Sequence, residues 1–354
     1  MQGRFTAALL FMHRTAIVIL NWNGKGYLEK FLPSVIAFSS HNARVIVADN
    51  ASSDDSVPFL RKQFPQVEII QLEKNFGFTG GYNRALELVE AEYFVLLNSD
   101  VEVTEGWLDP LEKFMDEYPQ AAACQPKIKS FADRHLFEHA GACGGFIDFL
   151  GYPFCRGRIY NTLEADQGQY EKPMQVFWAT GACLMIRSAA FREAEGFDER
   201  FFAHMEEIDL CWRLQQSGKE IFVIPSSTVF HVGGGTLPKS NPRKTFYNFR
   251  NNLMMLFKNL PGHRLIWLIP VRLVLDGLAG IKFFFDGDRH DTFAVIKAHF
   301  AFYRFVLTHA GARIHRQRRV KVHPSKGIYH KSIAVEYYLR KKQYFKELDT
   351  EKFS

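Results

Sequence analysis

The sequence predicts a mixed α/β fold with a mostly parallel central sheet, flanked by helices. Short apolar runs rich in β-branched residues alternate with helical patterns through the first half of the chain. Apolar runs without polar alternation are typical of strands covered on both faces, as in parallel sheets. Repeated strand–helix–strand order implies βαβ units. A hydrophobic fraction of 47% is enough for a core and excludes general disorder.

The expected elements follow from these runs. We expect strands at 16–20, 45–48, 67–70, 93–97, 177–186 and 221–224. We expect helices at 28–38, 81–90 and 206–217. The Gly-rich, aromatic segment 131–173 is interpreted as an irregular insertion over the functional face, which would act as a lid that binds a substrate.

The chain divides into an α/β domain at 12–260 and a helical extension at 261–354. Residues 264–285 are mostly apolar, but Arg272, Asp276 and Lys282 interrupt them, which disfavours a simple membrane span. A second amphipathic stretch at 293–307 precedes a basic run. We favour an interfacial anchor on an anionic membrane leaflet. The alternative is a helical cap packed on the core.

Charge and cysteine content limit the class of protein that the chain can belong to. The net charge is +6, and the positive side chains gather near the C-terminus. The basic run has no aromatic residues interleaved on one face, and no sequence motif for nucleic-acid recognition accompanies it. We therefore expect no nucleic-acid binding. Five scattered cysteines without a C-x-x-C pair disfavour a disulfide framework and a structural zinc site, and favour a reducing compartment. We expect no secretion signal and a native start at Met12.

Polar clusters follow three expected strands, at the edge where open parallel sheets bind ligands. There is no P-loop and no G-x-G-x-x-G after the first strand, which disfavours a P-loop or dinucleotide fold. Carboxylates at this edge can accept a hydrogen bond from a nucleobase N–H. They can also bind an Mg²⁺ or Mn²⁺ ion that bridges the two phosphates of a diphosphate. The candidate ligand-binding residues are Asn21, Asn23, Asp49, Asn50, Ser52, Asp54, Asn98 and Ser99, and Asp100 is a candidate metal ligand.

A glycine-rich stretch at 75–84 precedes the second expected helix. Its glycines allow close backbone approach, and the helix start supplies free N–H donors. This pattern makes Asn75, Gly77, Gly80 and Asn83 candidates for contact with a phosphate-bearing ligand. The alternative is a flexible loop with a glycine-rich helix entry.

A second acidic group opens the expected helix at 206–217. Glu206, Glu207 and Asp209 are crowded enough to raise one another's pKa, which suits a general base. The alternative is that acids favour a helix N-terminus because of its dipole. His231 follows a strand and precedes glycines at 233–235, so it is a candidate ligand of the cation or the diphosphate. A structural histidine is the alternative.

Through these residues the chain resembles the family 2 glycosyltransferases, particularly their rhamnosyltransferase-like bacterial branch. The resemblance covers residues 15–261 and is specific in combination. The motifs are V-I-L-N-W-N-G, D-N-A-S-S-D, K-N-x-G-F-x-G-G-x-N, L-L-N-S-D-V, G-A-C-L-M-I-R from Gly181, and F-D-E-R-F-F-x-x-x-E-E-I-D-L-C-W-R. The resemblance implies a GT-A fold, a nucleoside-diphosphate sugar donor, a divalent metal and inversion at the anomeric carbon.

The resemblance also implies roles for individual residues. Asp49 would bind the nucleobase, with Asn21 and Asp54 lining the nucleoside site. Asn75, Gly77 and Asn83 match the donor-side loop, Gly181 lies in a donor-side motif, and Asp100 matches the last acid of the metal motif Asp-x-Asp. Glu207 stands where the family has its catalytic Asp, beside Glu206 and Asp209. Two departures stand out: Asn98 replaces the first acid of the metal motif, and the base is Glu, which leaves Glu206 and Glu207 both open.

The expected reaction is direct displacement. Glu207 would deprotonate an acceptor hydroxyl, which attacks the anomeric carbon while metal on Asp100 and His231 stabilises the leaving diphosphate. The donor would be of the dTDP-rhamnose or UDP-hexose type, and the acceptor a glycan or lipid-linked sugar of a bacterial surface polysaccharide. We expect a cytoplasmic protein bound peripherally at the inner face of the cytoplasmic membrane. The alternatives are a non-catalytic nucleotide-sugar-binding partner with a degenerate metal site and a sugar nucleotidyltransferase, although the latter lacks its Gly-rich basic signature.

Overall fold

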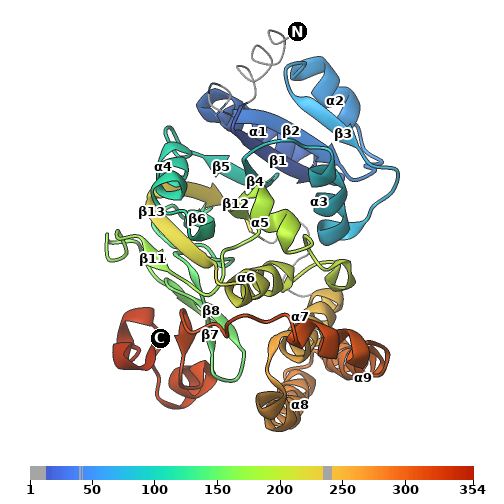
Figure 1. The fold of residues 1–354 in the computed structure, drawn as a ribbon, viewed down its shortest axis with the longest axis vertical. Coiled ribbons are helices and arrows are strands. Elements are labelled where there is room, and N and C mark those ends of the chain that lie inside the picture. The colour runs from blue at the N-terminus through green and yellow to red at the C-terminus, as the bar shows by residue number, and fades with distance from the viewer. Residues whose placement is uncertain (1–12, 40, 42, 234–240) are drawn as a thin grey trace, which may run out of the picture.

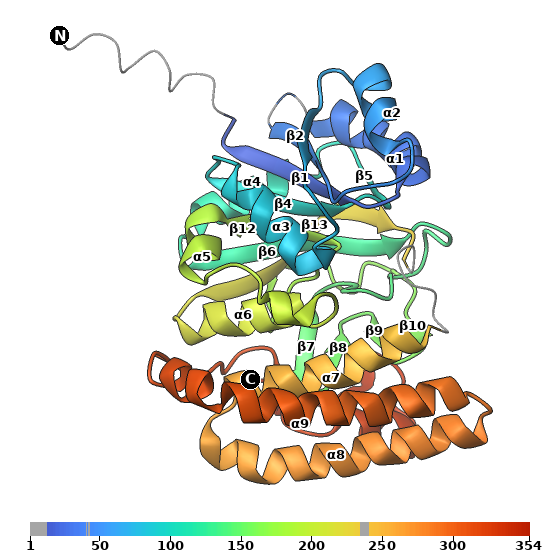
Figure 2. The same ribbon diagram turned by 90° about the vertical axis from the view of Figure 1, so that its right-hand side faces the viewer.

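The computed structural model describes residues 13–39, 41, 43–233 and 241–354. The expected start at Met12 and two of the three glycines after Val232 therefore lie outside the described residues. The chain folds in layers, with one large sheet between two sets of helices, and a smaller sheet and three further helices beyond it (Figures 1 and 2).

The large sheet confirms the predicted α/β class. Its strand order is β11-β13-β6-β12-β4-β1-β2-β3, with β5 paired to β13. The block β4-β1-β2-β3 is wholly parallel, as the apolar runs predict. The strands are β1 (Thr15–Asn21), β2 (Ala43–Asp49), β3 (Glu68–Gln71), β4 (Tyr93–Asn98), β5 (Val101–Val103), β6 (Ala121–Ser130), β11 (Met174–Gln175), β12 (Cys183–Arg187) and β13 (Glu220–His231).

The other half of the sheet is mixed, which the sequence did not indicate. β12 runs antiparallel to both β4 and β6. The expected strand at 177–186 is correspondingly shorter, because its first residues leave the large sheet. The backbone of Phe177 bonds to Gly145, and Thr180 N donates to the side chain of Gln125 at 2.9 Å.

Helices cover both faces of the large sheet, which explains the unbroken apolar runs. In β1, Ala16 and Val18 point into one core cluster while Ile17 and Ile19 point into the other. A strand that is buried on both faces needs apolar residues at every position. The helices of the α/β half are α1 (Lys25–Ser39), α2 (Ser56–Gln63), α3 (Gly77–Glu87), α4 (Asp109–Glu117), α5 (Ser188–Glu193) and α6 (Glu206–Gln216).

The insertion at 131–173 is more regular than expected. It builds a small sheet from β7 (Gly145–Asp148), β8 (Pro153–Cys155), β9 (Arg158–Ile159) and β10 (Thr162–Leu163). A strand from the C-terminal region, β14 (Ile328–Tyr329), pairs in parallel with β7. The rings of Phe345 and Phe353 pack against Phe146 and Phe154. The last residues of the predicted extension thus return to the insertion and complete its core.

Three helices form the layer beyond the small sheet: α7 (Pro242–Asn259), α8 (Gly262–Phe285) and α9 (Arg289–Gln317). The predicted domain boundary falls at the break between α7 and α8, where Pro261 precedes the first turn of α8. α8 and α9 lie side by side as an antiparallel hairpin, at the end of the molecule away from β2 and β3 (Figure 2). Within the residues that the structure describes, no helix is both long enough and apolar enough to cross a membrane.

Candidate active site

The polar residues at the ends of β1 and β2 form one hydrogen-bonded cluster. Asn21 and Asp49 are register partners in the parallel ladder. Asn21 Nδ2 donates to Asp49 Oδ1 at 3.0 Å and to Ser52 Oγ at 3.2 Å. Ser52 N donates to Asp49 Oδ2 at 3.0 Å. The sheet edge therefore holds these three predicted residues together, with Asp49 oriented by two donors.

Further predicted residues surround this cluster. Asn23 Oδ1 accepts from Ser53 N at 2.7 Å, and Asp54 Oδ2 accepts from Lys25 N at 3.1 Å. These bonds join the loops that follow β1 and β2. Asn98 ends β4 opposite Leu20 of β1, and Ser99 lies beside the turn at Gly24. The ends of three neighbouring strands thus converge as the sequence predicts.

The glycine-rich loop is tied to the same edge through Asn50. Asn50 Nδ2 donates to Asn75 Oδ1 at 3.1 Å and to Gly77 O at 2.9 Å. Gly77 has a φ of +72°, and a Cβ atom there would come within 2.6 Å of the Phe202 ring. Glycine is required at this position for both its backbone angle and its contact. The loop thereby touches the segment that leads into α6.

Three residues of the donor-side motifs make other contacts. Asn83 uses both ends of its amide on the backbone of Phe197, donating to its oxygen at 2.8 Å and accepting from its nitrogen at 2.9 Å. Gly80 faces Phe76 and Arg84, and Gly181 faces the ring of Phe78. These close contacts explain why glycine stands at 80 and 181 and asparagine at 83. They also leave the amide of Asn83 with little capacity to hydrogen-bond a ligand.

His231 lies between two carboxylates. Its Nε2 is 3.1 Å from Asp100 Oδ1 and its Nδ1 is 3.3 Å from Glu138 Oε2. Burial lowers the pKa of His231, but the hydrogen bonds to Asp100 and Glu138 outweigh this and raise the pKa to about 10. Glu138, from the insertion, is a buried site residue that the sequence did not reveal, because no motif surrounds it.

The Asp100–His231 pair fits a divalent cation only in part. In residues 13–39, 41, 43–233 and 241–354, no group of three or more His, Cys, Asp or Glu side chains is placed to hold a metal ion. Asp100 Oδ1 and His231 Nε2 are hydrogen-bonded to each other at 3.1 Å, so a cation would take the place of the proton between them. Glu138 beside Nδ1 is the carboxylate that commonly orients a metal-binding histidine. Two protein ligands suit Mg²⁺ or Mn²⁺ that is also held by substrate phosphates.

The acids at the start of α6 have unequal surroundings. Glu206 is buried, and the Oε2 atoms of Glu206 and Glu207 both lie buried without a hydrogen-bond partner. Burial raises the pKa of Glu207 to about 7, and burial together with the Glu207 charge raises the pKa of Glu206 well above its usual range. A carboxylate with a pKa near neutrality and an unused oxygen can accept a proton.

Asp209, two residues further along α6, is fully engaged. It accepts from Lys258 Nζ at 2.9 Å, Arg213 Nε at 2.8 Å and Asn259 Nδ2 at 2.8 Å. Burial alone would raise the pKa of Asp209, but the charges of Lys258 and Arg213 hold it well below its usual range. Such a carboxylate is a poor proton acceptor, so Asp209 anchors α6 and is disfavoured as the base.

The segment before α6 has a strained backbone. Phe202, His204 and Met205 have φ angles of 66°, 70° and 72°, in the left-handed region that side chains other than glycine rarely adopt. Such strain persists only where neighbouring groups impose it, and it gathers at functional sites. The fully buried Asn251 of α7 imposes it here. Its Nδ2 lies 3.0, 2.8 and 2.8 Å from the carbonyl oxygens of Phe201, Ala203 and His204.

A backbone contact joins the segment before the acidic helix to the helix that follows the glycine-rich loop. Phe202 O accepts from Phe78 N at 3.0 Å, which joins the strained segment to the start of α3.

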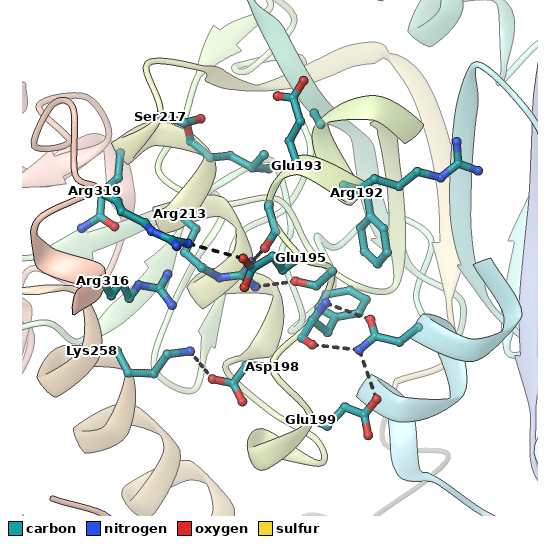
Figure 3. Close-up of a pocket in the computed structure, with 18 of the residues that line it drawn as sticks. Arg192, Glu193, Glu195, Asp198, Glu199, Arg213, Ser217, Lys258, Arg316 and Arg319 are labelled. Carbon is teal, nitrogen blue, oxygen red and sulfur yellow. Dashed lines mark hydrogen bonds and ion pairs between the residues drawn. The ribbon is translucent and has the colours of Figure 1, made fainter. Parts of the chain in front are cut away.

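A cavity of about 1090 Å³ lies elsewhere, between α5, α6, α9 and the short helix η1 (Glu199–Phe201). Asn83 is the one predicted donor residue in its lining. Some of its charged groups pair with one another: Lys258 bonds to Asp198, and Arg319 lies 3.7 Å from Glu195 (Figure 3). Its size alone does not make it the active site, because neither the strand-end cluster nor Glu207 contributes to it.

The fold is shared with solved glycosyltransferases. Staphylococcus aureus TarS, residues 1–349, superposes with a TM-score of 0.52 at 16% identity, covering 94% of this chain and 93% of that one. GalNAc-T7, solved with UDP, GalNAc and Mn²⁺, superposes with a TM-score of 0.54 at 14% identity over 70% of this chain and 48% of that one. These likenesses show that the chain has the GT-A fold.

Sequence relatives identify the family. The family model described as Glycosyl transferase family 2 matches residues 16–194. An N-acetylglucosaminyl-diphospho-decaprenol L-rhamnosyltransferase of Mycobacterium tuberculosis is 26% identical over 75% of this chain and 90% of its own length. The rhamnosyltransferase WbbL of Escherichia coli is 24% identical over 71% of this chain and 94% of its own length. The chain belongs to glycosyltransferase family 2 and is similar to its rhamnosyltransferases.

We predict that Asn251→Asp lowers kcat by roughly 100-fold, with little change in the KM for the donor. The substitution keeps the shape of the side chain but replaces the donating NH₂ by an oxygen that faces three carbonyl oxygens. The strained segment would then shift Glu207 without disturbing the strand-end cluster. Steady-state kinetics with varied donor concentration measures both constants.

Asn252→Asp is the matched control. Asn252 is also buried in α7. Its Nδ2 donates to Gly151 O at 3.0 Å and reaches the strained segment only at the side-chain sulfur of Met205, at 3.9 Å, so it holds none of the three carbonyl groups that Asn251 holds. Each substitution is expected to reduce the free energy of unfolding by about 1–3 kcal/mol, since each leaves a buried acceptor unpaired. Equal losses of kcat in the two variants would show that Asn251 has no specific role in positioning Glu207.

Proposed function

We propose that this glycosyltransferase transfers a sugar with inversion from a nucleoside diphosphate to an acceptor hydroxyl. The observation that carries the proposal is Glu207. It combines a pKa raised to about 7, a buried oxygen without a partner, and a position fixed by the strained segment before α6. Inversion by direct displacement requires one base, which takes the acceptor proton as the oxygen attacks the anomeric carbon.

Glu207 is preferred over Glu206 as the catalytic base because the two carboxyl groups titrate differently. Burial and the Glu207 charge raise the pKa of Glu206 well above its usual range, which favours its protonated form. Burial raises the pKa of Glu207 to about 7, so Glu207 changes its charge near neutral pH. The proton of the acceptor hydroxyl goes to Glu207, and the anomeric carbon–oxygen bond to the diphosphate breaks as the new glycosidic bond forms.

The strand-end cluster is proposed to bind the donor. Asp49, oriented by Asn21 and Ser52, would accept a hydrogen bond from the nucleobase. Asp100 and His231 would hold Mg²⁺ or Mn²⁺ together with the diphosphate oxygens. The bound cation would neutralise the negative charge of the leaving group. GalNAc-T7, which shares the fold, is described with UDP and Mn²⁺. The donor is proposed to be of the dTDP-rhamnose or UDP-hexose type.

The acceptor is proposed to be a lipid-linked sugar or a glycan of a bacterial surface polysaccharide. The M. tuberculosis relative is named for a decaprenol-linked acceptor and the E. coli relative for rhamnose transfer. A lipid-linked acceptor requires contact with a membrane. We accordingly propose a cytoplasmic enzyme that binds peripherally at the inner face of the cytoplasmic membrane.

We predict that Glu207→Gln lowers kcat by about 10²–10⁴-fold, while binding of the donor nucleotide is retained. The wild-type kcat should fall as pH decreases through about 7, because Glu207 must be deprotonated to accept the proton. Kinetics across the pH range, together with nucleotide titration of the variant, measures both effects.

Glu206→Gln is the matched control for this experiment. Glutamine resembles a protonated carboxyl, the form that burial and the Glu207 charge favour for Glu206, so kcat should change little. The conservative change Glu207→Asp keeps a carboxylate and should retain more activity than Glu207→Gln. A severe loss in Glu206→Gln with activity kept in Glu207→Gln would assign the base to Glu206 instead.

We also predict that one nucleoside diphosphate among UDP, dTDP, GDP and CDP raises the thermal stability of the protein more strongly with Mn²⁺ or Mg²⁺ than without. A ligand that binds only the folded state stabilises it by about 2.7 kcal/mol at a hundred times its Kd. Asp100→Asn should remove the metal-dependent part of the shift and leave the metal-independent part. The absence of a shift with every nucleotide would contradict the proposed donor class.

A further inference from the structure

The helix α8 is apolar on its outer side and charged on its inner side. Arg272 and Asp276, which interrupt its apolar sequence, are both buried. Arg272 Nη1 donates to Leu150 O at 3.0 Å, and its guanidinium lies 3.7 Å from the centre of the Tyr152 ring. Arg272 Nη2 is also 3.5 Å from Asp276 Oδ1. These charges are used to attach α8 to the loop between β7 and β8.

The outer side of α8 is a continuous apolar stripe. Its exposed residues recur at intervals of three or four, the spacing of one face of a helix. Five of them, Ile266, Val274, Leu278, Ile281 and Phe285, are each more than half exposed. The exposed large apolar residues of α8 are Ile266, Trp267, Val271, Val274, Leu278, Ile281, Phe284 and Phe285.

The neighbouring helix α9 repeats this arrangement. Ala294, Val295, Ala298, Phe302 and Phe305 are buried on its inner side. Its exposed large apolar residues are Phe293, Ile296, Phe300, Tyr303, Leu307 and Ile314. We call the exposed apolar residues of α8 and α9 together the hairpin face. A contiguous apolar surface of this extent on a folded protein marks an interaction site.

The exposed charged side chains of α8 and α9 themselves are all basic, although Lys282 pairs with Asp286 in the turn between the helices. Lys282 of α8 and Arg289, Lys297 and Arg304 of α9 are exposed. Asp276 and Asp291, the acidic residues of these two fully described helices, are buried and half-buried respectively. The exposed acids nearby, Asp286 and Asp288, lie in the turn between the helices.

We propose that the hairpin face binds the surface of an anionic lipid bilayer, with α8 and α9 lying in the plane of the headgroups. Apolar helices with lysine and arginine at their edges are the pattern of interfacial membrane binding. Anionic lipids attract such cations. A second copy of the chain is a poorer occupant, because a symmetric pairing of two hairpin faces would bring cations against cations.

The orientation that follows links this surface to the reaction. The hairpin lies at the end of the molecule away from β2 and β3, and α7 lies between it and the strained segment (Figures 1 and 2). Bound in this way, the protein rests on the membrane through the hairpin and holds the α/β half away from it. The binding itself does not depend on the chemistry, whereas its use in reaching a lipid-linked acceptor rests on the proposed function.

Co-sedimentation of the full chain with vesicles tests the proposal. We expect binding to vesicles of phosphatidylcholine and phosphatidylglycerol in equal parts, and weaker binding to phosphatidylcholine alone. The double substitution Leu278→Glu with Phe300→Glu should weaken binding to the anionic vesicles by roughly tenfold or more, because it places charge in the apolar contact. Lys297→Gln with Arg304→Gln should weaken binding to anionic vesicles only and reduce its salt dependence.

Leu88→Glu is the matched control. Leu88 is an exposed leucine at the end of α3 and is not part of the hairpin face, so its substitution should leave vesicle binding unchanged. The nucleotide-induced thermal shift should be the same in all variants, which separates this proposal from the proposed function. Equal vesicle binding by wild type and the Glu double variant would overturn the proposal. A wild-type dimer that ignores vesicles and becomes monomeric in that variant would overturn it in favour of a second copy.

Discussion

The arrangement of the site depends on how the side chain of Asn251 holds the backbone before α6. Three carbonyl groups converge on one amide nitrogen, and this fixes Phe202, His204 and Met205 near backbone angles that their side chains disfavour. Because the helix begins directly after them, the strained segment sets where the acids of its first turn stand. The same segment caps the glycine-rich start of α3 through the carbonyl of Phe202. One buried amide in α7 thus connects the donor-side loop, the acidic helix and the helical layer.

The surroundings of the acids in α6 give them different pKa values, although the sequence alone does not distinguish them. Glu207 and Asp209 are two residues apart, yet Asp209 is saturated by cations and an amide, while Glu207 keeps an unused buried oxygen. Cationic partners lower the pKa of the first, and burial raises the pKa of the second. The sequence suggests that crowding raises the pKa of each acid. This holds for Glu206 but not for Asp209. The pKa of Asp209 is lowered mainly by its pairing with Lys258, which is distant in sequence.

The α/β fold and the meeting of strand ends could be predicted, because parallel strands impose apolar runs and direct their carboxyl ends to one edge. Asn21, Asp49 and Ser52 meet there for that reason. Glu138 and Asn251 could not be predicted, since each acts through contacts far along the chain and neither has a local pattern. The position of Asn83 illustrates the opposite case, a motif residue whose amide the backbone of Phe197 occupies. For α8, composition showed charges within an apolar stretch, but only the packing showed that Arg272 and Asp276 turn inward.

A single base at Glu207 and direct displacement together require a product of inverted anomeric configuration. NMR spectroscopy of the purified product, made from an anomerically pure nucleotide sugar and a lipid-linked acceptor, reads that configuration from the one-bond carbon–hydrogen coupling at the new linkage. The account predicts the configuration opposite to that of the donor. A product that retains the configuration of the donor would contradict it, because retention requires a chemistry other than one displacement assisted by one base.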